Sequence, residues 1–228
     1  MTPIAIRSLR FCWPGSSKPI LDIEKFDLNA QEKVMLRGPS GSGKSTLLSA
    51  IAGVIEVPKA SVHVAGTDVG GVSGSDRDRF RVDHLGIIYQ VFNLLPWLSA
   101  LDNVLLPCRF STRRRENVAD DPMKAATRLL GELGLTDAKL LNGPANALSI
   151  GQQQRVAAAR ALIGSPEVVL ADEPTSALDE EAKDAFVELL LKECNQSGAS
   201  LLFVSHDRTL EMHFDRTVEM TMLNGGAA

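Results

Sequence analysis

The sequence contains few cysteines, and it contains no long apolar run. The three cysteines among its 228 residues, Cys12, Cys108 and Cys194, lie far apart and show no C-x-x-C spacing. This pattern argues against a zinc site or a redox pair and favours free thiols in a reducing compartment. No apolar run reaches the ~18 residues that a membrane-spanning helix needs, and the first residues lack the charged and apolar segments of a secretory signal. We therefore expect a soluble, cytoplasmic chain that meets a membrane only through another protein.

The charge balance gives the chain no overall basic field. Its net charge is −4, which argues against nucleic acid as the main partner. The only dense basic cluster in the sequence is Arg113-Arg114-Arg115. We predict that this cluster is a solvated loop or helix face rather than a contact with a lipid headgroup or a partner. A hydrophobic fraction of 44% and a charged fraction of 23% are those of an ordinary globular protein.

A glycine-rich stretch is the strongest motif in the chain. It follows the apolar run 34–36 and precedes apolar residues at helical spacing, which is the strand–loop–helix context that a phosphate-binding loop requires. In such a loop the backbone N–H groups surround a nucleotide's phosphates, Lys44 acts as a point charge on them, and the Ser45 hydroxyl is a ligand of Mg²⁺. The alternative, a Gly/Ser turn before a helix, explains the complete motif less well. The residues that fit G-x-x-x-x-G-K-[ST] and its flanks are Gly38, Pro39, Ser40, Gly41, Ser42, Gly43, Lys44, Ser45 and Thr46.

Polar residues follow three further apolar runs of the sequence. Gln90 follows residues 85–89, Asp172 and Glu173 follow residues 168–171, and His206 comes shortly after residues 201–204. In parallel sheets, ligands bind outside the carboxyl ends of the strands. We interpret Asp172 as an acid on the metal side, Glu173 as a base that orients water, and Gln90 and His206 as contacts to Mg²⁺, water or the γ-phosphate. Each residue alone would be an ordinary strand end; the phosphate loop upstream favours the catalytic interpretation.

A second helix start and a helical insertion complete the pattern. Residues 4–28 roughly alternate like short antiparallel strands, whereas residues 91–150 are predicted to be largely helical. The apolar side chains that open this insertion are equally compatible with internal packing and with a partner contact. Ser149 and Gly151 stand at the start of an amphipathic helix, either as a plain N-cap or as a second phosphate-binding helix end. Residues 176–179 cap another helix, which runs to about Cys194.

Together these motifs resemble those of the ATP-binding cassette (ABC) ATPases, and the resemblance spans nearly the whole chain. The signature separates this family from kinases and GTPases. The matching segments are the Walker A motif at 38–46, the Q-loop Gln90, the signature LSIGQ at 148–152, the Walker B motif VVLADE at 168–173, the D-loop SALD at 176–179 and the switch histidine His206.

The resemblance implies an α/β fold: a P-loop NTPase core with a parallel sheet, an N-terminal antiparallel β subdomain and an inserted helical subdomain. Residues 1–228 would form one nucleotide-binding domain, with the ATP-binding core at 1–90 and 151–228 and the helical subdomain at about 91–150. It further implies ATP and Mg²⁺ as ligands, with Mg²⁺ organised by Ser45, Gln90 and Asp172.

The resemblance also implies a second copy of the chain. Two such domains pair head to tail, with ATP between one phosphate loop and the other chain's signature. Nucleotide contacts are then expected from Ser149, Gly151 and Gln152, and also from Asp179 of the D-loop. Trp13 stands where the family usually has a tyrosine that stacks on adenine. Ile150 departs from the usual glycine of the signature.

Residues 92–107, FNLLPWLSALDNVLLP, look like those of lipoprotein-releasing, macrolide-exporting and peptide-detoxifying cassettes. In that mechanotransmission group, ATP-driven closure moves domains on the far side of the membrane. By this resemblance the chain is an ATPase that drives a separate permease, bound at the inner face of the cell membrane, with no direct nucleic-acid partner. Three alternatives stay open: a cell-division or other regulatory cassette, a nucleic-acid-associated ABC ATPase, and a cassette that binds ATP only as a regulatory clamp.

Overall fold

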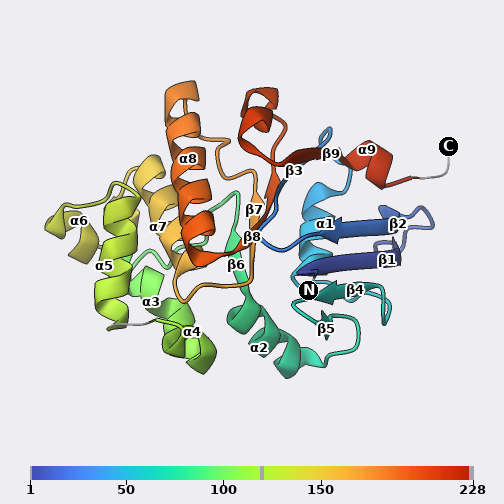
Figure 1. Ribbon diagram of the computed structural model, residues 1–228, viewed down its shortest axis with the longest axis horizontal. Helices are drawn as coiled ribbons and strands as arrows, with labels where there is room; N and C mark the ends of the chain where they lie inside the picture. Colours follow the sequence, from blue (N-terminus) through green and yellow to red (C-terminus); the bar gives the residue numbers. More distant parts are fainter. Residues whose placement is uncertain (1, 119–120, 226–228) are drawn as a thin grey trace.

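The computed structural model describes residues 2–118 and 121–225, and a five-stranded parallel sheet forms its centre (Figure 1). The strand order is β6-β7-β8-β3-β9, and every neighbouring pair is parallel. Strands buried on both faces read as continuous apolar runs, and β7 and β8 fit this description, since their burial is nearly complete. The bounds are β3 Lys33–Arg37, β6 Leu85–Ile88, β7 Val168–Asp172, β8 Ser200–Val204 and β9 Arg216–Glu219.

A second, antiparallel sheet flanks the first and has the order β2-β1-β4-β5. In β1 the buried residues Ile4, Ile6 and Leu9 face the core, and β2 pairs with this strand along its whole length. The alternation in the sequence therefore predicted this sheet correctly. Two further short strands, β4 and β5, complete the sheet beside β1. The bounds are β1 Ile4–Phe11, β2 Leu21–Leu28, β4 Val62–Val64 and β5 Thr67–Asp68.

Helices cover the other side of the parallel sheet, in the green and yellow part of Figure 1. The prediction of a helical insertion is confirmed: in the described residues of 100–118 and 121–147, every regular secondary-structure element is a helix. No helix in the described part of the chain is long and apolar enough to cross a membrane. These helices are α3 Ala100–Phe110, α4 Thr112–Glu116, α5 Pro122–Glu132, α6 Ala138–Asn142 and the short η1 Ala145–Ala147. The remaining helices are α1 Lys44–Ile51, α2 Gly74–His84, α7 Ile150–Leu162, α8 Glu180–Ser197, η2 Arg208–His213 and α9 Met220–Leu223.

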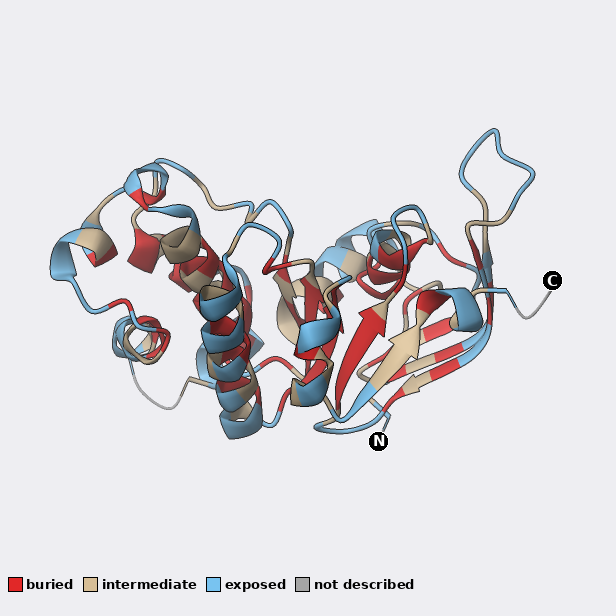
Figure 2. Cartoon of the chain, turned by 90° about the horizontal axis from the view of Figure 1, so that it is seen from above, coloured by how far each residue is buried: buried red, intermediate tan, exposed pale blue. Residues whose placement is uncertain are grey.

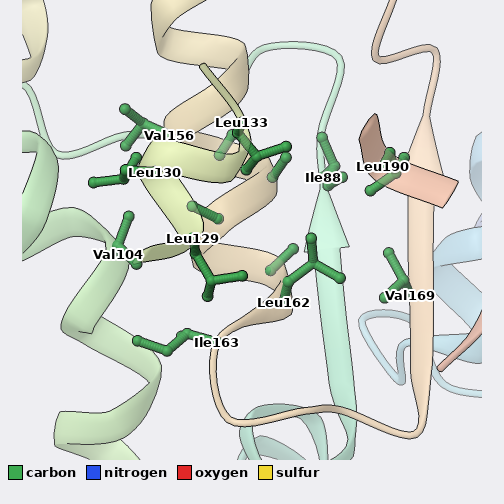
Figure 3. Packing of buried hydrophobic residues seen from close by; sticks show 14 of the residues in the cluster. Ile88, Val104, Leu129, Leu130, Leu133, Val156, Leu162, Ile163, Val169 and Leu190 are labelled. Atoms are coloured by element: carbon green, nitrogen blue, oxygen red, sulfur yellow. The ribbon is translucent and has the colours of Figure 1, made fainter. Parts of the chain in front are cut away.

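Two hydrophobic clusters occupy the two faces of the parallel sheet. One joins the helices α3, α5, α7 and α8 to the sheet, and Figure 3 shows ten labelled members from Ile88 to Leu190. The other joins the antiparallel sheet and α1 to the opposite face. In β3, for example, Met35 faces the first cluster, whereas Val34 and Leu36 face the second. Figure 2 shows the buried residues concentrated on the strands and on the inner sides of the helices.

Arg114 contradicts the prediction of a solvated basic cluster. Its neighbours Arg113 and Arg115 are exposed, but Arg114 is only 1% exposed. The guanidinium donates hydrogen bonds to four backbone carbonyls around it, and burial lowers its pKa to about 10, so that it stays charged at neutral pH. It thereby ties α4 to the ends of α2 and α7. The acceptors are the carbonyl oxygens of Val82, Leu85, Ala161 and Ile163.

Candidate nucleotide site

The phosphate loop connects the end of β3 to the start of α1. Gly43 occupies the last position before the helix with φ of 99°, a left-handed conformation that glycine adopts without strain. A Cβ atom there would also lie 2.9 Å from the carbonyl oxygen of Ile20. The helix begins at Lys44, so the N–H groups of its first turn have no partner within the helix and are free to bind an anion at this end. The local sequence therefore gives the loop the backbone geometry that phosphate binding would require.

The Lys44 side chain folds back onto the phosphate loop. Its ammonium group donates hydrogen bonds to the carbonyl oxygens of Gly38, at 2.7 Å, and Pro39, at 3.0 Å. The side chain is only 8% exposed, and its Nζ lies 4.0 Å from Oε1 of Glu173. A buried cation that is held by weak carbonyl acceptors can exchange them for a phosphate oxygen, which is a stronger, charged acceptor. The loop thus holds the lysine where a nucleotide's phosphates would meet it.

The two carboxylates predicted at the end of β7 lie beside this loop. Asp172 is the last residue of β7 and pairs with Val204 in β8, and the N–H of Glu173 donates to the Val204 carbonyl oxygen at 3.0 Å. Glu173 has φ of 46°, which is unfavourable for a residue with a side chain. This turn aims its carboxylate at His206, whose Nδ1 lies 2.6 Å from Oε2. The predicted base and the predicted switch histidine are therefore in contact.

Asp172 has the environment of a metal ligand. Its Oδ1 is buried and has no hydrogen-bond partner among the described residues. Burial raises the pKa of this carboxyl, the adjacent charge of Glu173 raises it further, and the Ser45 hydroxyl and Lys44 oppose the shift. A divalent cation would satisfy the orphaned oxygen and favour the ionised form.

The other predicted ligands also suit Mg²⁺ rather than a softer metal. Ser45 and Gln90 supply neutral oxygens, and both line an open cleft beside the phosphate loop. Within residues 2–118 and 121–225, no three His, Cys, Asp or Glu side chains are grouped so that they could hold a metal by themselves. Mg²⁺ is commonly held by one or two protein oxygens together with substrate phosphates and water. The donor set therefore fits an ion that arrives with a nucleotide.

An open cleft of about 710 Å³ gathers most of the predicted site residues. Trp13 stands at its rim with 47% of its surface exposed and packs edge-on against Phe11, with ring centroids 5.1 Å apart. Ile20 also lines the cleft, although the sequence indicated only a strand residue there. The lining residues are Trp13, Ile20, Ser40, Gly41, Gly43, Lys44, Ser45, Thr46, Gln90, Glu173 and His206.

The signature and D-loop residues do not line this cleft. Ser149 forms a capping box at the start of α7: its Oγ accepts from the N–H of Gln152 at 3.3 Å, and the Gln152 side chain accepts from the Ser149 N–H at 2.9 Å. The first residue of the helix, Ile150, is 54% exposed. Asp179 caps α8 by accepting from the N–H of Ala182 at 2.9 Å. The N-cap interpretation of Ser149 is thus confirmed, and its contact with a nucleotide stays a prediction.

Comparisons with known proteins agree with this arrangement. The family model described as "ABC transporter" matches residues 21–176. The chain belongs to the ABC transporter family. The cassette is 42% identical to a "Lipoprotein-releasing system ATP-binding protein LolD" of Novosphingobium aromaticivorans, an alignment that covers 95% of each chain. It is 37% identical to a "Macrolide export ATP-binding/permease protein MacB" of Rhodopseudomonas palustris, where the match covers 96% of this chain and 32% of that protein.

The chain is also similar in fold to a solved cassette structure that holds the products of ATP hydrolysis. That structure is described as a dimeric post-hydrolysis state of the ATP-binding cassette MJ0796 bound to ADP and Pi. The TM-score is 0.84 at 31% identity, and the match covers 98% of this chain and 95% of that one. The predicted fold class, a P-loop core with an antiparallel β subdomain and a helical subdomain, is confirmed. The cassette is an ATPase of this family.

Proposed function

We propose that this chain is the ATPase subunit of a membrane assembly of the lipoprotein-releasing or macrolide-exporting kind. Two copies close head to tail on ATP, and their closure drives a separate permease at the inner face of the membrane. The observation that carries the proposal is the position of Ser149 and Gly151. They lie at the exposed start of the otherwise largely buried helix α7, outside the cleft of their own chain, so the cleft needs the same helix start of a second copy to close over the γ-phosphate.

The residues of the cleft have distinct tasks in hydrolysis. Lys44 and the loop N–H groups stabilise the charge that develops on the phosphates. Mg²⁺, held by Ser45, Gln90 and Asp172, would neutralise phosphate charge when it is bound with ATP. Glu173 accepts the proton of the attacking water, since its carboxylate lies within 4.0 Å of Lys44 and close to the loop. His206 holds that carboxylate through Nδ1 and helps to place the water.

A second cleft offers a docking place for the permease. It measures about 340 Å³ and lies between α2, α3 and β6, with Tyr89 and Phe110 in its lining. Phe110 is 76% exposed, and Val91 and Trp97, which do not line this cleft, are 77% and 72% exposed. Exposed apolar groups of this size commonly mark a contact with another protein. Arg160 lies on α7, the helix that begins with the signature. It donates hydrogen bonds to the carbonyl oxygens of Phe92 and Asn93, and so joins the segment after Gln90 to that helix. A permease segment seated here would sense both Gln90 and the signature.

A mixing experiment tests the head-to-tail arrangement. Lys44→Ala removes the phosphate contact but keeps the signature, and Ser149→Arg blocks the signature but keeps the phosphate loop. Each variant alone should be inactive. An equimolar mixture should recover about a quarter of the wild-type ATPase rate, because half of the dimers would contain one competent site. If the mixture stays inactive although both variants fold and Ser149→Arg binds ATP, the shared site is wrong.

Membrane extracts test the coupling to a permease. A tagged wild-type chain should co-purify with an integral-membrane protein, whereas Phe110→Asp should lose that protein and keep ATP binding. Glu188→Gln, a change on an exposed face of α8, serves as the control that retains both. Retention of the membrane partner by Phe110→Asp would contradict the docking site. Salt-sensitive binding to duplex DNA or RNA, with no membrane protein recovered, would support the nucleic-acid alternative instead.

A further inference from the structure

The last described segment of the chain, residues 219–224, lies against the phosphate loop. The strand β9 pairs with β3 in parallel, and Glu219 is in register with Arg37, the residue before Gly38. The Glu219 carboxylate also accepts hydrogen bonds from the Arg37 guanidinium. The segment that begins at Glu219 is therefore anchored at the point where the loop begins.

Met220 forms the floor beneath the loop. Its side chain is completely buried. A Cβ atom at Gly38 would lie 3.0 Å from Cβ of Met220, and one at Gly43 would lie 3.3 Å from its Cε. Both motif glycines are thus needed for this close approach as well as for the backbone turn. These contacts limit movement of the loop toward Met220.

Asn224 joins the loop to the neighbouring turn through its side-chain amide. Nδ2 donates to the carbonyl oxygen of Ile20 at 2.7 Å and to that of Ser42 at 3.3 Å. Oδ1 accepts from the N–H of Asp22 at 2.6 Å. The side chain thereby connects the phosphate loop with the segment that follows Trp13, and both parts line the nucleotide cleft.

The contact with Ser42 fixes the direction of a phosphate-binding group. Ser42 C=O and Gly43 N–H belong to one planar trans peptide, so the two bonds point in opposite directions. While the carbonyl points at Asn224, the Gly43 N–H points to the other side of the peptide. Gly43 lines the cleft, and because the peptide turns about ψ of Ser42 and φ of Gly43, the glycine on one side offers little resistance to its rotation. Without Asn224, the peptide could turn its carbonyl oxygen toward the phosphates.

We propose that Asn224 is a positioning residue for nucleotide binding, which holds the Ser42–Gly43 peptide and the Trp13 side of the cleft in their binding geometry. The group it prepares the loop to receive is the phosphate chain of a nucleotide. The inference rests on nucleotide binding in this cleft, and it is independent of dimerisation and of the permease. Its loss weakens substrate and transition state alike, and so raises KM while kcat stays nearly constant.

Direct binding of a fluorescent ADP or ATP analogue to the purified chain tests the inference. Asn224→Ala should weaken binding about fivefold to tenfold, the size expected for loss of two or three modest hydrogen bonds and of loop order. Asn224→Asp keeps the acceptor for Asp22 but sets a carboxylate against two carbonyl oxygens, so it should weaken binding more. Asn142→Ala, in α6, is the matched control. It also removes a hydrogen bond from a side-chain amide to a backbone carbonyl oxygen, 2.8 Å long, but Asn142 does not line the cleft. That control should bind nucleotide like the wild type.

Steady-state ATPase kinetics and thermal melting separate positioning from loss of fold. In Asn224→Ala and Asn224→Asp, KM should rise in step with the dissociation constant, with kcat within about twofold of wild type. Unchanged nucleotide affinity in both variants would overturn the proposal, and so would a fall in kcat at constant KM. An equal loss of affinity in Asn142→Ala would assign the effect to general stability and overturn it too. If the mixing experiment failed while these affinity changes were observed, only the head-to-tail dimer would be wrong. The role of Asn224 would stand.

Discussion

His206 Nδ1 lies 2.6 Å from Glu173 Oε2, so the switch histidine contacts the carboxylate that we propose as the base. The histidine side chain is 69% exposed, whereas that of Glu173 is 17% exposed. One ring nitrogen is therefore occupied by the base, and the other is free to meet a phosphate or a water in the cleft. The pair thus spans the distance between the end of β7 and the place where the γ-phosphate would lie.

Replacing the base should separate nucleotide binding from hydrolysis. Glu173→Gln keeps the shape of the side chain but cannot accept the water proton, so the ATPase rate should fall at least about 100-fold while ATP still binds. The variant should also accumulate as an ATP-bound dimer on gel filtration. Glu188→Gln is the matched exposed change and should retain the wild-type rate. An unchanged turnover rate in Glu173→Gln would assign the base elsewhere.

Removing the switch histidine should lower turnover without loss of stability. His206→Ala deletes an exposed ring whose contact is with Glu173, so we expect kcat to fall about 10- to 100-fold. The melting temperature should stay within a few degrees of wild type, since little apolar surface is buried there. Double replacement with Glu173→Gln should cost no more than Glu173→Gln alone, because the two residues act as one unit. Additive losses in the double variant would show that His206 acts independently.

Replacing Arg114 should destabilise the fold far more than replacing its neighbour. Arg114→Ala leaves three buried carbonyl groups and a partly buried one without their donor, which should lower the free energy of unfolding by about 3 kcal/mol or more. Arg115→Ala removes an exposed side chain that donates to one carbonyl oxygen, on Cys108, and should cost under about 1 kcal/mol. Urea unfolding followed by circular dichroism measures both. Equal losses of stability in the two variants would contradict the inference that the buried Arg114 guanidinium holds α4 against α2 and α7.

Glu193 should make stability depend on pH. Burial, together with the nearby Glu132 carboxylate, raises the pKa of Glu193 from 4.5 to about 7, against the opposing charges of Arg128 and Lys192. Because the folded-state pKa is raised, this residue's contribution is fully favourable below pH 4.5 and is lost as pH rises through 7.

Glu193→Gln should therefore be more stable than wild type at pH 8, by about 1 to 2 kcal/mol. The gain should vanish near pH 4, where the wild-type carboxyl is protonated. Urea unfolding at both pH values measures the difference, with Glu188→Gln as the exposed control. A gain that is the same at both pH values would show that proton binding at Glu193 is not its cause.

Much of the site was predictable because its parts are encoded locally. The phosphate loop is a contiguous motif, and Asp172 and His206 come directly after or close to buried apolar strands. Parallel strands bring their carboxyl ends to one edge of the sheet, so these residues had to meet. The contact between Glu173 and His206 follows from the pairing of Asp172 with Val204.

The rest depends on contacts that the local sequence does not encode. Three consecutive arginines look alike, and only the packing of α4 turns Arg114 inward. Asn224 meets Ile20 and Ser42 across 204 and 182 residues of sequence, and no short pattern records such a contact. The alternatives for Ser149 stayed open because its capping geometry within one chain is the same whether or not a second copy supplies a phosphate to it.

At position 173 the backbone conformation favours glycine, whereas the proposed role in hydrolysis requires a carboxylate. The φ of Glu173, 46°, suits glycine, and a glycine there would relax the strain and ease folding. The same exchange would delete the group that activates water. Selection for abundance alone would therefore favour losing the base, and only selection for ATP turnover retains it. A Glu173→Gly cassette should therefore be well folded and bind ATP without hydrolysing it.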